Sequence, residues 1–179
     1  GGDHPTAAVL AMFLPKTQSL IFFAEMVKSG QSAYANAVEL QQMLVPLGCD
    51  FIIGYDPAMN ARVFDKNADE RIIDNYIEVI GDRFVEGARG DAAFDELAKM
   101  LEFQDDFTAS RPAMPRILVT ENCTQIRRAG VQLTWDMVAR KRHMWQVDVG
   151  DAMKIAASVV KRGYVSGEVS VESMAPRLA

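Results

Sequence analysis

The chain contains few of the residues on which metal and disulfide chemistry depend. Among its 179 residues there are two cysteines, Cys49 and Cys123, and two histidines, His4 and His143. Two cysteines cannot build a disulfide-rich scaffold, and these four scattered residues lack the paired spacing of a zinc site. We therefore expect two buried, reduced thiols in a cytoplasmic protein that needs no cofactor.

Long apolar runs and glycine-rich phosphate loops are also missing. The longest apolar run, residues 7–14, ends at Pro15, well short of the roughly 18–20 residues that a membrane span requires. Residues 65–69 match the start of an EF-hand loop, but Glu70 replaces the turn glycine and Tyr76 the closing glutamate. We expect no membrane span within these residues, no metal and none of the familiar nucleotide enzymes. An enzyme is the third-ranked interpretation, with Cys123 or His143 as its catalytic candidates.

What the chain does contain is apolar residues at helical spacing. Its 49% hydrophobic and 24% charged residues are typical of a globular domain, which we expect to span 1–179. The spacing predicts a fold that is mainly α, a compact multi-helix domain. The predicted helices follow Asp3 as far as Pro15 and then cover 18–28, Ser32 to Leu44, 68–88, a segment after Asp91, 122–129, 135–145 and 151–162. We also expect short buried strands at 51–54 and 117–120, and a C-terminal β-hairpin at 166–172.

The charge is distributed unevenly along the chain. Residues 1–121 contain 10 Lys and Arg against 19 Asp and Glu, whereas residues 122–164 contain 8 against 3. Residues 105–116 hold two prolines and little periodicity, so we expect a subdomain boundary there, between an acidic 1–104 and a basic 117–179. The net charge of −5 therefore excludes a uniformly basic protein but not a local basic site.

The leading interpretation is a protein-interaction or regulatory domain that belongs to a larger chain or assembly. The predicted 68–88 helix has an apolar stripe and an opposite acidic face, formed by Asp74, Glu78, Asp82 and Glu86. The predicted 135–145 helix carries a basic patch next to tryptophan, formed by Arg140, Lys141, Arg142 and Trp145. Two complementary patches would bind protein partners, or would let copies of the chain associate head to tail.

The alternative is a nucleic-acid-binding module at the C-terminal end. Its candidate phosphate contacts are Arg127, Arg128, Lys154, Lys161 and Arg162. Short helices, the sequence of residues 159–165 and the expected hairpin give the last 50 or so residues a pattern that resembles winged-helix modules. The resemblance implies DNA binding, but Glu168 and Glu172 would place negative charge on the expected wing. A solvated basic face that complements the acidic half is the simpler explanation.

Overall fold

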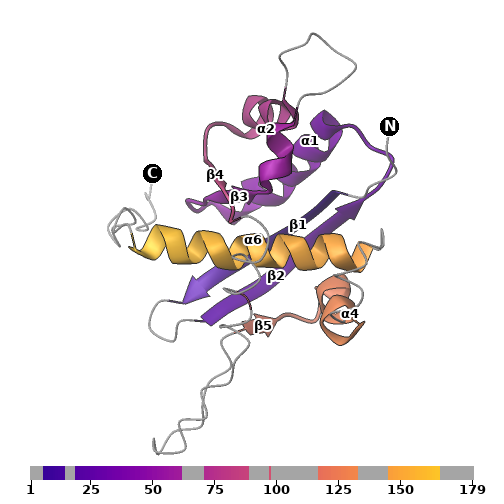
Figure 1. The fold of residues 1–179 in the computed structure, drawn as a ribbon, viewed down its shortest axis with the longest axis vertical. Helices are drawn as coiled ribbons and strands as arrows, with labels where there is room; N and C mark the ends of the chain where they lie inside the picture. The colour runs from indigo at the N-terminus through magenta and orange to yellow at the C-terminus, as the bar shows by residue number, and fades with distance from the viewer. Residues whose placement is uncertain are drawn as a thin grey trace, which may run out of the picture.

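Two β-sheets and four α-helices form the described part of the protein (Figure 1). The computed structural model describes residues 6–14, 19–61, 71–88, 97, 117–132 and 145–165. The larger sheet has the strand order β1-β2-β5, in which β1 (Thr6–Leu14) and β2 (Ser19–Lys28) are antiparallel and β5 (Ile117–Val119) is parallel to β2. The smaller sheet pairs β3 (Ile53–Tyr55) with β4 (Phe84–Glu86) in parallel.

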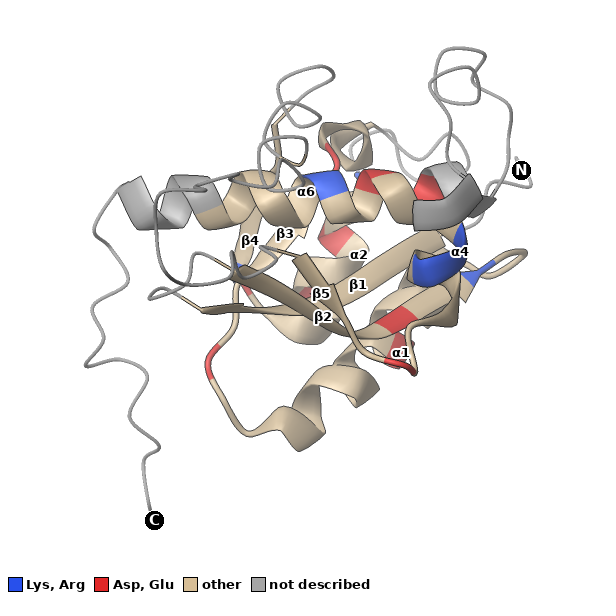
Figure 2. Cartoon of the chain, turned by 90° about the horizontal axis from the view of Figure 1, so that it is seen from below, with Lys and Arg blue, Asp and Glu red and all other residues tan. Residues whose placement is uncertain are grey.

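The helices cover both faces of the larger sheet. Cores of buried residues link α1 (Ala33–Leu44) and α2 (Ile72–Ile80) to one face, and α4 (Thr124–Gln132) and α6 (Trp145–Val165) to the other. Figure 2 shows α6 above the sheet and α1 below it. Two short 3-10 helices, η1 (Val45–Leu47) and η2 (Pro57–Asn60), follow α1 and β3. The result is a layered α and β fold.

The prediction of a mainly α fold is wrong, because the first two predicted helices are the long strands β1 and β2. Ala7, Val9 and Phe13 pack toward α4 and α6, whereas Ala8 and Leu10 pack toward α1 and α2. A strand with both faces covered needs apolar residues at every position. Its sequence then shows no alternation, and periodicity alone cannot separate it from a buried helix.

A β-bulge explains why β2 also resembles a helix in sequence. Leu10 pairs with Ala24, but the next residue, Ala11, pairs with Phe22, so Phe23 is the extra residue of β2. Leu20 and Phe22 therefore face α6, and beyond the bulge Met26 faces α1 and α2. The bulge interrupts the period of two that identifies a strand.

Within the described residues, the predicted 68–88 helix is correct from Ile72 to Ile80; residues 68–70 lie outside the described ranges. Gly81 has φ +97°, a conformation that L-residues rarely adopt, and it ends α2 directly after Ile80. The chain then forms β4 instead of further helical turns.

Several other predicted elements are confirmed. Ser32 accepts a hydrogen bond from the backbone N–H of Ala35 (3.2 Å) and caps α1, which ends at Leu44. Strands are present at 53–55 and 117–119, and helices at 124–132 and 145–165. The last helix is longer than predicted, because it begins at Trp145 and continues past Gly163. The predicted boundary at 105–116, the 135–145 helix before Trp145 and the hairpin at 166–172 lie outside the described residues.

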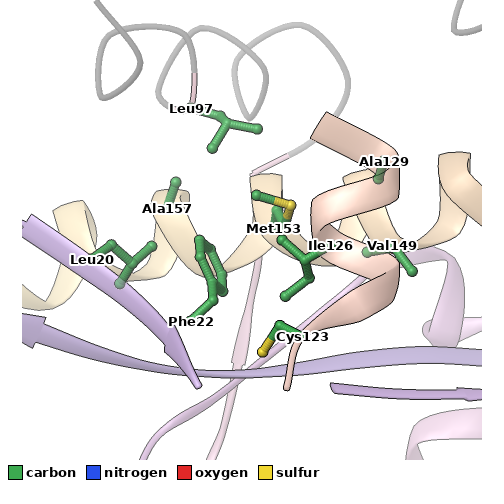
Figure 3. Packing of buried hydrophobic residues seen from close by; sticks show 9 residues of the cluster. All are labelled: Leu20, Phe22, Leu97, Cys123, Ile126, Ala129, Val149, Met153 and Ala157. Carbon is green, nitrogen blue, oxygen red and sulfur yellow. The ribbon is translucent and has the colours of Figure 1, made fainter. Parts of the chain in front are cut away.

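One of the two cores joins the sheet to α4 and α6 (Figure 3). Leu20 and Phe22 project from β2 toward Met153 and Ala157 of α6, and Ile126 of α4 lies beside them. The backbone of β3 also approaches α6 closely. A Cβ atom built on Gly54 would lie 2.6 Å from Cγ2 of Val159, so only glycine fits there without movement. One helix thus packs on both sheets.

Candidate functional site

A carboxylate from β2 holds the first turn of α4. Beyond the bulge Glu25 lies on the α4 side of the sheet, where one carboxylate oxygen accepts the backbone N–H of Gln125 (2.7 Å) and the other that of Ile126 (2.8 Å). The hydroxyl of Thr124 donates to the same carboxylate at 3.3 Å. An anion at a helix N-terminus satisfies free N–H groups and interacts favourably with the helix dipole. Here the protein supplies that anion itself.

Next to this carboxylate lies the thiol of Cys123. Cys123 is fully buried, and its Sγ lies 3.6 Å from Oγ1 of Thr120. Burial raises the pKa of the Cys123 thiol, the charge of Glu25 adds to the rise, and the hydrogen bond with Thr120 opposes it. A reactive cysteine needs a lowered pKa and access to solvent. The predicted burial of Cys123 is confirmed, and this environment does not suit it as a nucleophile; His143 lies outside the described residues.

A second polar cluster is buried between β1, α1 and α2. Nδ2 of Asn36 donates to Oγ1 of Thr6 at 3.0 Å, and both side chains hydrogen-bond the phenol of Tyr76. Burial raises the pKa of Tyr76, and the two hydrogen bonds oppose the rise. Oδ1 of Asn36 has no partner among the described residues. These contacts join the start of β1 to both helices.

The four predicted acidic residues do not form one helical face. Asp74 accepts both the backbone N–H (2.8 Å) and the guanidinium (2.7 Å) of Arg71, which lowers the pKa of Asp74. Glu78 is exposed on α2, Asp82 is exposed in the turn after α2, and Glu86 belongs to β4, where it accepts a hydrogen bond from Asn60 (3.1 Å). Because α2 ends at Ile80, only the first two are helical.

The predicted basic residues are described only in part. Arg127 and Arg128 are exposed on α4. Lys154 lies on α6 and is paired with Asp151 one turn before it, so its charge is partly neutralised within the helix. Lys161, Arg162 and Trp145 belong to α6, but their side chains lie outside the description. The patch of Arg140, Lys141 and Arg142 also lies outside it.

Sequence reasoning did not identify a run of exposed apolar side chains directly after α1. Val45 is 72% exposed, Leu47 37% and Ile52 51%, and Cys49 between them is exposed too. We call Val45, Leu47, Cys49 and Ile52 the 45–52 surface. The expectation that Cys49 is buried is therefore wrong. The only signal in the sequence is that apolar residues continue beyond the helix end, through Pro46.

Charged residues lie along one border of the 45–52 surface. Asp50 lies 3.5 Å from the guanidinium of Arg83, which lies 4.9 Å from the centre of the Phe51 ring. The backbone N–H of Ile53 donates to the carbonyl of Arg83 at 2.9 Å, so residues 50–53 and 82–84 run side by side. This places the exposed Asp82 next to the surface.

The turn between α1 and β3 is also tied to the end of α2. Nε2 of Gln41 donates to the carbonyl of Val79 at 2.5 Å, and Val45 lies one helical turn after Gln41. The exposed Glu78 precedes Val79 directly. The 45–52 surface and the carboxylates of Glu78 and Asp82 therefore belong to one region of the molecule, on the α1 and α2 side of the larger sheet.

Searches of protein-family models, of curated proteins and of solved structures found no match to this chain. In the described ranges, no group of three or more His, Cys, Asp or Glu side chains is placed to hold a metal ion. None of the helices in that part of the chain is both long and apolar enough to cross a membrane.

Proposed function

We propose that this chain is a protein-interaction domain that binds its partner through the 45–52 surface. The observation that supports this is the exposure of Val45, Leu47 and Ile52 within eight residues. Exposed apolar side chains that are clustered and bordered by polar residues are typical of protein-binding surfaces. Complete burial of one such side chain contributes roughly 1.5–3 kcal/mol.

The surface is held in place by the fold. Leu44, directly before Val45, is buried in the core with α2, and Ile53, directly after Ile52, is hydrogen-bonded to the β4 side. A preorganised surface avoids part of the entropy that a flexible loop would lose on binding. Asp50 and Asp82 at its border favour a partner that presents both apolar and basic side chains.

Photo-crosslinking from Cys49 tests the proposal. Cys123 is buried, so a benzophenone maleimide added to the folded protein should label Cys49 alone. In lysate of the source cells we expect a discrete crosslinked product whose second component mass spectrometry identifies. Val45→Asp together with Ile52→Asp should abolish that product.

The matched control is Tyr34→Asp. Tyr34 is 49% exposed, a fraction similar to the 51% of Ile52. It lies at the opposite end of α1 from the 45–52 surface. The control variant should keep the product. If the wild-type protein gives no discrete product, or if the Val45→Asp/Ile52→Asp variant gives the same product, the proposed function is wrong.

A further inference from the structure

Two exposed arginines on α4 have no ionic partner in the described part of the chain. Arg127 and Arg128 are both exposed, and no carboxylate of that part pairs with either. Their neighbours Ile126 and Ala129 are buried against α6, and Glu25 holds the start of the helix. The two guanidinium groups therefore extend from a helix whose position is well defined.

On the other side of the sheet two carboxylates are equally free. Glu78 and Asp82 are exposed, and neither forms an ion pair with a described residue. Arg83 is the one described cation beside them, and it is already paired with Asp50. This border of the 45–52 surface therefore has an excess of negative charge.

The two charged regions belong to different layers of the described fold. Arg127 and Arg128 belong to α4, which shares a core with α6, whereas Glu78 belongs to α2, which shares a core with α1 on the other face of the sheet. Complementary regions on different faces of one molecule favour a head-to-tail contact between copies. Such a contact repeats, and it builds a ring or an open filament.

We propose that the partner of the 45–52 surface is a second copy of this chain, whose Arg127 and Arg128 contact the carboxylates of Glu78 and Asp82. The proposal rests on the proposed function and names its partner. Salt weakens contacts between exposed charges, because the Debye length falls from about 10 Å at 0.1 M to about 3 Å at 1 M. Self-association should therefore weaken as salt is added.

Sedimentation velocity of the purified full chain over a range of concentrations tests the proposal. At low salt we expect the wild-type sedimentation coefficient to rise with concentration. Arg127→Glu with Arg128→Glu should weaken association by at least about tenfold, as should Glu78→Arg with Asp82→Arg. The quadruple variant with all four substitutions should associate again, because both charges of each contact are exchanged.

The quadruple variant controls for a loss of folding, and circular dichroism should show native spectra for all three variants. A wild-type protein that stays monomeric at every concentration overturns self-association, as does a folded quadruple variant that stays monomeric. A monomeric wild type that crosslinks from Cys49 to a different protein overturns self-association but leaves the proposed function in place. A monomeric wild type that binds duplex DNA through Arg127 and Arg128 also overturns it.

Discussion

Glu25→Ala should destabilise the protein more than any other single change of an exposed or half-buried charge described here. The substitution removes the acceptor of two backbone N–H groups, at 2.7 and 2.8 Å, and of the Thr124 hydroxyl. A hydrogen bond to a charged group contributes about 1.5–3 kcal/mol. Water can reach the exposed Thr124 end of the cluster and replace part of this, so the lower value applies to each of the two backbone bonds. We expect a loss of about 3 kcal/mol.

Urea unfolding followed by circular dichroism measures this loss as a shift of the midpoint at unchanged slope. Glu39→Ala is the matched control, because Glu39 forms a half-exposed ion pair with Lys28 (2.6 Å), and pairs near the surface contribute about 0–1 kcal/mol. Glu25→Gln keeps one acceptor oxygen and should lie between the two. If Glu25→Ala is no more destabilising than Glu39→Ala, the Glu25 carboxylate does not anchor α4.

Three further predictions concern packing, ionisation and thiol access. Gly54→Ala should cost about 1–3 kcal/mol in urea unfolding because its Cβ would collide with Val159, and Val159→Ala should recover part of that loss; additive effects would contradict the contact. Because the pKa of Tyr76 is raised in the folded protein, the unfolded state loses its phenol proton first, and stability should fall as the pH rises above about 10. Tyr76→Phe removes this loss, so the difference in stability between wild type and variant should shrink above that pH; a constant difference would refute the assignment. A thiol reagent should react rapidly with Cys49 and with Cys123 only after denaturation, and two fast thiols would show that Cys123 is accessible.

Local signals in the sequence predicted those elements whose ends depend on a few neighbouring residues. Ser32 caps α1 through its own hydroxyl, and α1 ends at Leu44, directly before the segment that contains Pro46 and Gly48. The β-branched residues before Gly54 predict a strand at 51–54, and the structure has one at 53–55. These features require no knowledge of what packs against them.

The two longest strands could not be recognised in the same way. β1 has helices on both faces, so its residues 7–14 are apolar without alternation, and the bulge at Phe23 interrupts the alternation of β2. Helical spacing fits these segments by coincidence. Both faces of β1 and of β2 pack against helices, so apolar residues are found at positions on both sides of each strand. The layers, and not the local sequence, decide that these segments are extended.

The single acidic face was predicted wrongly and the 45–52 surface was not predicted, because both depend on tertiary structure. The predicted acidic face assumed one helix from 68 to 88, but Gly81 redirects the chain and separates Glu86 from Glu78. Exposure of Val45 and Ile52 depends on which neighbours leave them uncovered, and no pattern in the sequence records that.

The position of α6 has a consequence for protein synthesis. α6 packs on β1, β2 and β3, yet it is the last described element to be made. At roughly 5–20 residues per second, the ribosome takes several seconds or more to proceed from Lys28 to Ala157. During this time the newly made apolar hairpin of β1 and β2 lacks α6 on the face that α6 covers in the folded protein. The nascent chain is therefore an expected client of chaperones, and fragments that end before residue 145 should aggregate when expressed.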